Sequence, residues 1–280
     1  MSTARSRLHR SRRRHGLVTI AGFALTAMLL SACATSGPSP DATTASSAPT
    51  TVDPSTTPEP TPAETAPTEE APTSAPAFDK TAMSIDDPAS LWVVSDKLRP
   101  LSPADYAPTD LVTVDVAHQN PPVLRKEPAA ALLQLFAAGE AEGAGAMQVQ
   151  SAYRSYATQV SVYDGWVKQL GQAQADIQSA RPGYSEHQTG LVVDISPVPL
   201  SCALQACMGD TPQGKWLAAN AWRYGWLLRY PADKTAVTGF TYEPWHFRYI
   251  GVPLATEMHD QHITTLEEFF GLPAAPTYAN

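Results

Sequence analysis

The chain has 280 residues, with 26 prolines, three cysteines and a formal net charge of −8 at pH 7. Residues 78–280 contain every Trp and Tyr and six of the seven Phe, which is enough apolar material for one hydrophobic core in a single folded domain. The same segment carries 13 Lys and Arg against 21 Asp and Glu. This acidic balance argues against nucleic acid and anionic lipid surfaces as partners.

The first 32 residues are expected to form a secretory signal peptide. Six arginines within the first 14 residues precede an apolar run over 17–30, which is too short to span a membrane comfortably. The run ends in Leu-Ser-Ala-Cys at 30–33, which resembles the lipobox of bacterial lipoproteins. We therefore expect Cys33 to be lipidated as the mature N-terminus. An ordinary signal peptide with an incidental cysteine is the alternative, and Sec and Tat export are not distinguished.

Residues 33–77 have the composition of a disordered linker. They contain 10 Pro, 17 Ser or Thr and six acidic residues in a stretch of 45, with no Lys, no Arg and no aromatic residue. Such a segment cannot bury enough apolar surface to offset the entropy lost on ordering. We expect an extended tether that holds the domain of residues 78–280 away from the membrane.

The domain itself is predicted to be α+β, with a mainly antiparallel sheet flanked by helices. Strands are expected at 91–94, 111–114, 147–153, 191–195, 226–230 and 240–250. Helices are expected at 127–142, 155–170, 211–222 and 253–270. Ser155 and Thr211 are suitable N-caps for two of these helices. Because strands and helices do not alternate in βαβ units and no glycine-rich phosphate loop is present, parallel nucleotide-binding folds are excluded.

Two cysteines remain after Cys33, and they lie close together at Cys202 and Cys207. In a secreted protein, thiols this close are exposed to oxidising conditions and tend to pair. We predict a disulfide between them. The alternative, a cysteine-containing metal site, lacks further cysteine ligands.

Candidate chemistry begins at His187 and Asp194, with Gly190 between them. The glycine allows a sharp turn from a loop into a strand, which can bring the imidazole and the carboxylate together. A single pair of this kind is usually a structural hydrogen bond. The second cluster, with Glu243 and His246 three residues apart in an aromatic region, changes this interpretation because an unpaired charge there would be costly.

Two histidines and one aspartate form a three-ligand zinc site with a fourth position open, as catalytic zinc requires. Under this hypothesis Glu243 remains as the base that takes a proton from the attacking water. The sequence has no H-E-x-x-H motif, which excludes the helical zincin arrangement.

These segments resemble a known enzyme family. Residues 185–194 are similar to the S-x-H-x-x-G-x-A-x-D motif, and residues 243–246 to the E-x-x-H motif, of zinc D-Ala-D-Ala carboxypeptidases. The resemblance is to the VanY-type branch of a family that also includes VanX, and it extends from about residue 92 to 251. Further matching segments are 100–103, 106–111, 151–155, 159 and 182–184. It implies a Hedgehog/DD-peptidase-like zinc fold.

The resemblance also assigns roles to individual residues. It implies His187, Asp194 and His246 as zinc ligands, Glu243 as the general base, and Arg154 as the cation that stabilises the oxyanion. Without it, Arg154 would be taken for a solvated surface charge.

Two further residues, Gln159 and Ser185, are implied to bind the substrate's terminal carboxylate or backbone, although Ser185 could equally cap the turn that follows. The sequence departs from the family pattern at Val192, usually Ala, and at Asp96, commonly Asn. The first change should alter packing without affecting metal ligation, and the second leaves the role of position 96 open.

The expected function is a zinc-dependent D,D-carboxypeptidase that removes the C-terminal D-Ala from peptidoglycan stem peptides by Glu-assisted attack of zinc-bound water. The enzyme would be tied by lipid to the extracellular face of the bacterial cytoplasmic membrane. One alternative is an L,D-carboxypeptidase acting on tetrapeptide stems, and another is a non-catalytic lipoprotein that binds peptidoglycan.

Overall fold

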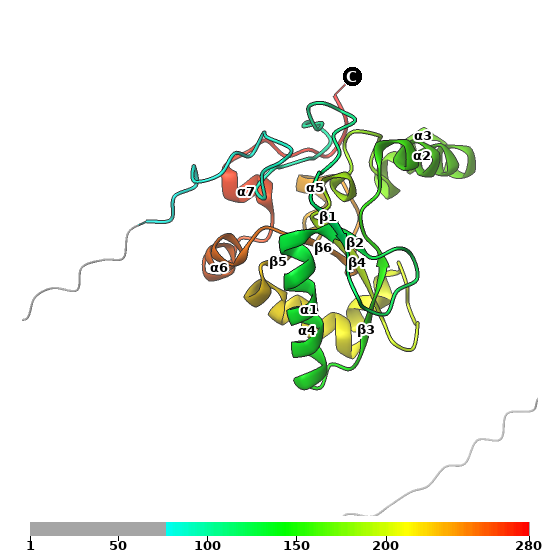
Figure 1. Cartoon of the computed structure of the whole chain (residues 1–280). Helices are drawn as coiled ribbons and strands as arrows, with labels where there is room; N and C mark the ends of the chain where they lie inside the picture. The colour runs from blue at the N-terminus through cyan, green and yellow to red at the C-terminus, as the bar shows by residue number, and fades with distance from the viewer. Residues whose placement is uncertain (1–76, 280) are drawn as a thin grey trace, which may run out of the picture. The chain divides into compact units, whose positions relative to one another are not determined.

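The computed structural model describes residues 77–279 (Figure 1). The expected signal peptide, the lipidation site Cys33 and almost all of the expected linker lie outside the described residues. No helix within 77–279 is long and apolar enough to cross a membrane.

A four-stranded antiparallel sheet forms the centre of the unit, with the strand order β3-β4-β6-β5. Its strands are β3 (Met147–Ser151), β4 (Val192–Pro197), β6 (His246–Tyr249) and β5 (Trp226–Leu228). A separate antiparallel pair contains β1 (Leu111–Thr113) and β2 (Val123–Arg125). The prediction of an α+β fold on an antiparallel sheet is confirmed.

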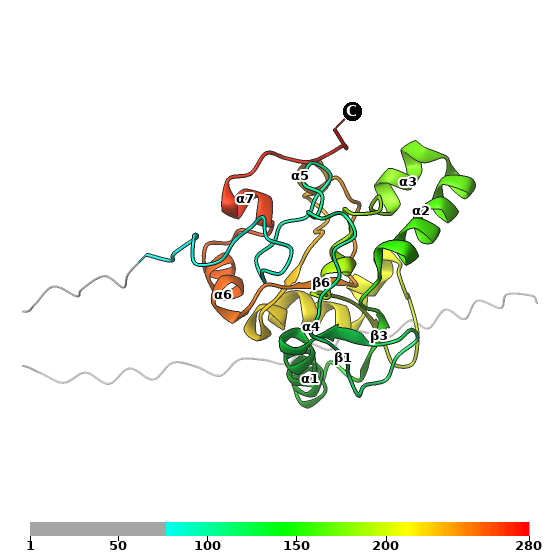
Figure 2. The same ribbon diagram turned by 45° about the horizontal axis from the view of Figure 1, so that its top comes forward.

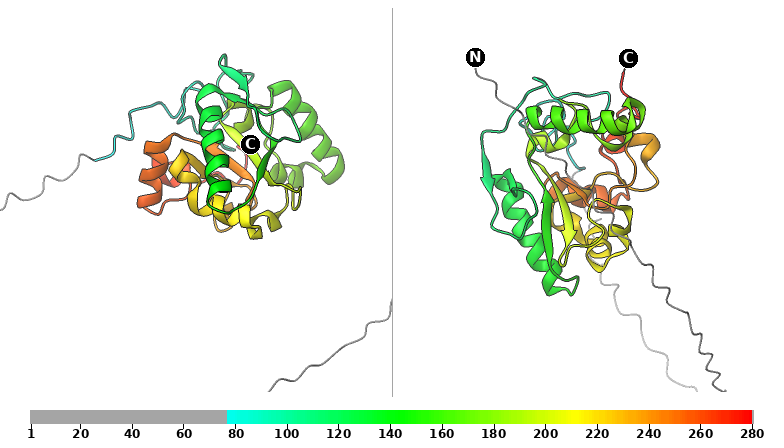
Figure 3. Two further views of the ribbon diagram at one scale, coloured as in Figure 1. Left: turned by 60° about the horizontal axis from the view of Figure 1, so that its bottom comes forward. Right: turned by 90° about the vertical axis from the view of Figure 1, so that its right-hand side faces the viewer.

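Helices surround this sheet (Figure 2). The α-helices are α1 (Lys126–Ala141), α2 (Tyr156–Leu170), α3 (Gln172–Gln178), α4 (Pro212–Asn220), α5 (Thr235–Thr238), α6 (Val252–Asp260) and α7 (Leu266–Phe270). Three short 3₁₀ helices are η1 (Glu186–Thr189), η2 (Ala206–Asp210) and η3 (Ala221–Tyr224). The predicted caps are confirmed, because the Ser155 hydroxyl accepts from the N–H of Thr158 and the Thr211 hydroxyl from that of Gly214. In Figure 3, α1 runs alongside the sheet while α2 and α3 lie beyond the strand ends.

Strands β4 and β6 have two chemically different faces. Alternate residues of a strand point to opposite faces. One face carries Val193, Ile195, Phe247 and Tyr249, which join the main hydrophobic core with side chains of α1 and α4. The opposite face carries Asp194, His246 and Arg248, and these polar side chains are buried as well. The candidate site is therefore built on the face that is turned away from α1.

Residues 91–94 were expected to be a strand, and this prediction is wrong. Trp92, Val93 and Val94 are buried, as the apolar run suggested, but the backbone lies in turns and coil. The guanidinium of Arg248 donates to the carbonyls of Leu91 and Val93, at 3.0 and 2.8 Å. A buried side chain therefore satisfies backbone groups that a neighbouring strand would otherwise satisfy.

Most other elements agree with the sequence prediction to within two residues, but two differ more. The strand expected at 240–250 begins only at His246, because Pro244 cannot donate to a sheet ladder. The closing helix expected at 253–270 is divided into α6 and α7, since Thr265 caps a new helix by accepting from the N–H of Glu268. The strand β2 and the helices α3 and α5 had no counterpart in the sequence prediction.

The predicted disulfide is present between Cys202 and Cys207, whose Cα atoms are 5.6 Å apart. It closes a short loop between β4 and α4. Leu204, at the tip of this loop, lines the same cavity as the candidate site described next.

Candidate metal centre

Three neighbouring strands place polar side chains at one level of the sheet. Asp194 of β4 pairs with His246 of β6 on one side and with Ser151 of β3 on the other. Directly opposed residues on one face of a sheet have Cβ atoms about 5 Å apart. The strand register therefore brings Asp194 and His246 together although 52 residues separate them in the sequence.

The turn before β4 supplies the second imidazole. His187 lies in η1, and Gly190 ends this element in the left-handed conformation, with φ of 68°. A Cβ on Gly190 would lie only 2.9 Å from a side-chain carbon of Leu111, so both the backbone conformation and the space require glycine. The backbone N–H of Arg154 donates to the His187 carbonyl at 3.2 Å, which ties this turn to the end of β3.

His187, Asp194 and His246 each offer a ligand atom, and these atoms lie within 4.8 Å of one another. The Nε2 atom of His187 is 3.4 Å from Asp194 Oδ2, and the Nδ1 atom of His246 is 3.3 Å from Asp194 Oδ1. All three residues are buried. The structure thus brings together the three residues that the sequence suggested as metal ligands.

Electrostatics differ sharply between the two rings. Burial lowers the pKa of His187 to about 3, which leaves the ring neutral and its lone pair free. Burial also disfavours the charged form of His246, yet the neighbouring carboxylates of Asp194 and Glu186 raise its pKa to about 9. The surroundings of His246 therefore carry surplus negative charge, which stabilises a cation.

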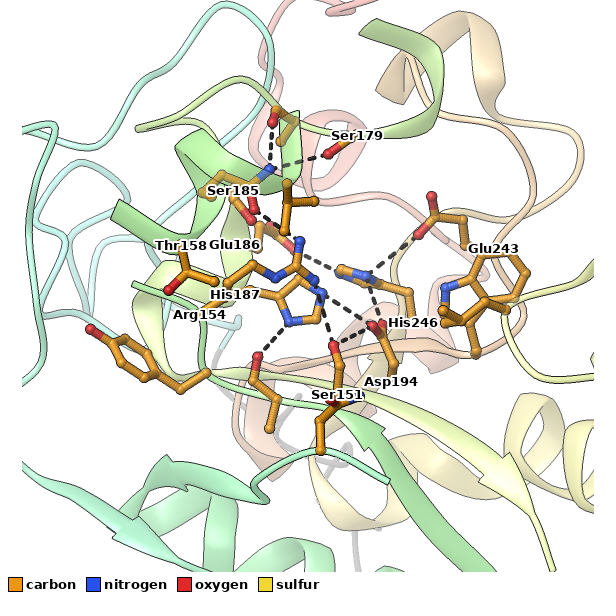
Figure 4. Close-up of a pocket in the computed structure, with 18 of the residues that line it drawn as sticks. Ser151, Arg154, Thr158, Ser179, Ser185, Glu186, His187, Asp194, Glu243 and His246 are labelled. Carbon is orange, nitrogen blue, oxygen red and sulfur yellow. Dashed lines mark hydrogen bonds and ion pairs between the residues drawn. The ribbon is translucent and has the colours of Figure 1, made fainter. Parts of the chain in front are cut away.

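Glu243 lies beside the three candidate ligands (Figure 4), and its Oε2 atom is 3.5 Å from Nδ1 of His246. Burial, with a smaller contribution from Asp194, raises the pKa of the Glu243 carboxyl to about 7, against the opposing charges of His246 and Arg154. The three candidate ligands, Glu243 and Arg154 all line one cavity of about 720 Å³. A carboxyl group in this position can accept and return a proton.

Arg154 reaches the cavity from the segment between β3 and α2. Its guanidinium donates to the Gln159 side-chain oxygen at 2.9 Å and contacts the Ser151 hydroxyl at 3.5 Å. Gln159 is fully buried, and its amide nitrogen donates to Ser179 and to the Ala180 carbonyl, at 3.1 and 2.6 Å. The polar atoms of Gln159 are thus occupied by the protein itself, in an arrangement that holds Arg154 in place.

Ser185 also lines the cavity and is 3% exposed. Its side chain makes no capping hydrogen bond to η1, so the alternative of a simple turn cap has no support in the structure. Neither departure from the family pattern adds or removes a candidate ligand. Val192 is fully buried in β4, and Asp96 accepts from the N–H of Leu98 at 2.7 Å within a tight turn.

Sequence reasoning missed two residues of the site. The hydroxyl of Ser151 donates to Asp194 Oδ2 at 2.7 Å, and Glu186 Oε2 lies 3.7 Å from His246 Nε2. Both residues fall inside the quoted motif segments 151–155 and 185–194, but the sequence gives no partner for either. Serine is common on protein surfaces, so Ser151 did not stand out. Glu186 is next to the candidate ligand His187 in the sequence, and the side chains of adjacent residues usually point in different directions.

A metal ion fits this donor set. Asp194 Oδ1 is buried and has no hydrogen-bond partner among the described residues, which is costly unless a cation or water is bound. Two imidazole nitrogens and one carboxylate are a usual ligand set of catalytic zinc, which leaves the fourth coordination position for another ligand. His187, Asp194 and His246 would hold the ion, and the cavity gives substrate access to it.

Comparison with known proteins agrees with the site. The VanY family, described as D-alanyl-D-alanine carboxypeptidase, matches residues 122–252. The protein YodJ of Bacillus subtilis (strain 168) is 40% identical over 192 residues, covering 67% of this chain and 69% of its own length. The chain belongs to the VanY family of D-alanyl-D-alanine carboxypeptidases.

Two of the similar solved structures differ in the specificity that their names state. The LdcB LD-carboxypeptidase, whose structure was described in terms of peptidoglycan recognition, has 39% identity and a TM-score of 0.61, covering 66% of this chain and 87% of its own. A mutant of the vancomycin resistance D,D-pentapeptidase VanY, from a VanB-type cassette and in complex with Zn(II), has 30% identity and a TM-score of 0.54. The match covers 64% of this chain and 97% of the VanY chain. The family therefore contains both D,D- and L,D-specific members.

Proposed function

We propose that this protein is a zinc-dependent D,D-carboxypeptidase that removes the C-terminal D-Ala from peptidoglycan stem peptides. One observation carries the proposal. The three candidate ligands, a buried carboxylate at Glu243 and a guanidinium at Arg154 all line the same cavity. The D,D specificity follows the family description, and the zinc follows from the donor set together with the Zn(II) in the related VanY structure.

Each residue has a definable task. When bound, zinc acts as a Lewis acid that polarises a carbonyl and acidifies water. Glu243 takes the proton of the attacking water and returns it to the leaving amine, which becomes the amino group of free D-Ala. Arg154 supplies a fixed positive charge next to the oxygen that becomes negative. Gln159 and Ser151 hold the guanidinium in the position required for this task.

A second candidate is an L,D-carboxypeptidase acting on tetrapeptide stems. The higher identity and TM-score of the LdcB LD-carboxypeptidase favour it. A third candidate, a non-catalytic binder of peptidoglycan, requires no base. The presence of Glu243 beside the ligands is therefore evidence against it.

Mass spectrometry of defined muropeptides tests these candidates. The purified full-length protein is incubated with zinc and with pentapeptide or tetrapeptide stems of known stereochemistry, and the Glu243→Gln variant serves as the control. We expect release of one D-Ala from the pentapeptide. Release only from the tetrapeptide would establish the L,D reaction instead. Intact substrates with a zinc-loaded protein would exclude both hydrolases.

For the location of the enzyme we propose a lipid anchor at Cys33, followed by the acidic tether of residues 33–77. Two acyl chains hold a protein on a membrane far more firmly than one, and the lipobox resemblance implies a diacylglyceryl group. Cys33→Ser should therefore move the protein from the membrane fraction to the soluble fraction or leave an unprocessed precursor. Membrane fractionation unchanged by this substitution would contradict the anchor.

A further inference from the structure

The two candidate histidine ligands present different ring nitrogens to the site. His187 presents Nε2, while its Nδ1–H donates to the Ala152 carbonyl at 2.7 Å. That bond fixes both the tautomer and the orientation of the ring. His246 presents Nδ1 instead, so its proton must lie on Nε2 and requires an acceptor of its own.

The atom that faces Nε2 of His246 is Oε2 of Glu186, at 3.7 Å. Both atoms are buried, and neither has a hydrogen-bond partner among residues 77–279. The other oxygen of Glu186, Oε1, accepts from Arg229 Nε at 2.9 Å and from Arg248 Nη1 at 3.0 Å. One carboxylate oxygen is thus occupied by two arginines. The other oxygen faces the imidazole of His246, and Figure 4 shows Glu186 beside this histidine.

A buried charge cluster keeps Glu186 ionised and fixed. Arg229 makes a bidentate pair with Glu267, at 2.8 and 2.7 Å, and Arg248 also donates to three backbone carbonyls. The side chains of Glu186, Arg229, Arg248 and Glu267 are all fully buried, and their two positive and two negative charges cancel. Such a cluster contributes little net stability compared with an apolar core, so its position behind a metal ligand suggests another role.

We propose that Glu186 is a positioning residue that accepts the Nε2–H of His246 and thereby holds Nδ1 as the ligand nitrogen. The present separation of 3.7 Å is longer than a hydrogen bond, so the proposal requires the imidazole ring to shift toward Glu186. In this arrangement the Ala152 carbonyl orients one ligand and the Glu186 carboxylate orients the other. The inference rests on the proposed function, because it presupposes zinc at the site.

Glu186→Gln tests the proposal, with Glu267→Gln as the matched control. Each substitution removes one carboxylate charge from the same buried cluster and leaves an amide oxygen for the arginines. Only Glu186→Gln places an NH₂ group, a donor, against the Nε2–H of His246. We expect the zinc dissociation constant, measured by chelator competition, to rise about 10- to 100-fold in Glu186→Gln and to change little in Glu267→Gln. Thermal unfolding of the metal-free proteins should show a similar loss of stability in both.

Equal weakening of zinc binding in the two variants, or parental affinity in Glu186→Gln, would overturn the proposal. A parent protein that binds no zinc would instead contradict the proposed function.

If Glu186→Gln does not fold, long-range ¹H–¹⁵N NMR spectra of the zinc-loaded parent protein provide an independent test. His246 is assigned there by comparison with His246→Gln. We expect a protonated Nε2 and a metal-shifted Nδ1. Zinc on Nε2 would overturn the proposal.

Discussion

The two faces of strands β4 and β6 are equally buried but differ in what holds them together. On the face toward α1 and α4, Val193 and Phe247 pack in an apolar core, where burial itself favours folding by about 25 cal/mol per Å². On the opposite face Asp194, His246 and Arg248 are buried polar groups, each of which costs free energy unless it is paired. The apolar face stabilises the domain, whereas the polar face carries the candidate site and lowers the stability of the fold.

This difference predicts that the two faces can be separated by mutation. Substitutions of the candidate ligands or of Glu243 on the polar face should remove metal binding or turnover with limited effect on folding. Substitutions on the apolar face should do the reverse.

The largest effect is expected at the ligands. His187→Ala should reduce bound zinc from about one ion per chain to nearly none and abolish turnover, because a three-ligand site does not tolerate the loss of one ligand. Elemental analysis of the purified protein measures this. His118→Ala, which changes an exposed histidine, should retain full zinc content. Stoichiometric zinc in His187→Ala would contradict the ligand assignment.

Glu243→Gln should keep zinc and folding but lower kcat by about 10²- to 10⁴-fold, since the amide preserves the shape of the side chain and cannot take a proton. Steady-state kinetics on the preferred stem peptide measures this change. The matched control Glu140→Gln alters an exposed glutamate of α1 and should leave kcat unchanged. Near-parental turnover in Glu243→Gln would mean that another group activates the water.

Arg154→Lys should lower kcat by about 10²-fold, as loss of an oxyanion-stabilising donor does in other hydrolases. Lysine keeps the charge but cannot bond to Gln159 and Ser151 with one planar group. Zinc content should be unaffected. If Arg154→Lys lost zinc in proportion to activity, the role of Arg154 would instead be to hold the metal ligands in position.

On the apolar face, Leu135→Ala in α1 should lower the free energy of unfolding by about 2–5 kcal/mol, because this side chain is fully buried in the main core. Zinc per folded chain and kcat should stay at parental values. Leu133→Ala on the same helix, where the side chain is 46% exposed, should cost less than about 0.5 kcal/mol. Chemical denaturation compares the two. Loss of zinc in folded Leu135→Ala would mean that the faces are coupled.

The smallest effect is expected at the loop that the disulfide closes. Replacing Cys202 and Cys207 with serine should cost about 2 kcal/mol or less, as the loop is short. Zinc content should not change, because no candidate ligand lies in the loop. In the native protein both thiols should resist alkylation until they are reduced, and rapid labelling without reductant would contradict the bridge.

Much of the fold could be predicted from local sequence. The helices at α1, α2 and α4 follow from apolar spacing and from the caps Ser155 and Thr211, which act through neighbouring residues. The prediction of a strand at 91–94 was wrong because an apolar run indicates that a segment is buried but not what its backbone groups bond to. Those partners come from Arg248, more than 150 residues away.

The sequence by itself determined the candidate ligands. His187, Gly190 and Asp194 lie within one turn and strand, and Glu243 and His246 lie three residues apart, so short-range spacing fixes much of their geometry. Only the tertiary structure decided which ring nitrogen of each histidine faces the site and what supports it. Glu186, Arg229, Arg248 and Glu267 come from η1, the end of β5, β6 and α7. These charged residues are far apart in the sequence and come into contact only when the sheet and its flanking helices have formed. No local sequence pattern can therefore predict their contacts.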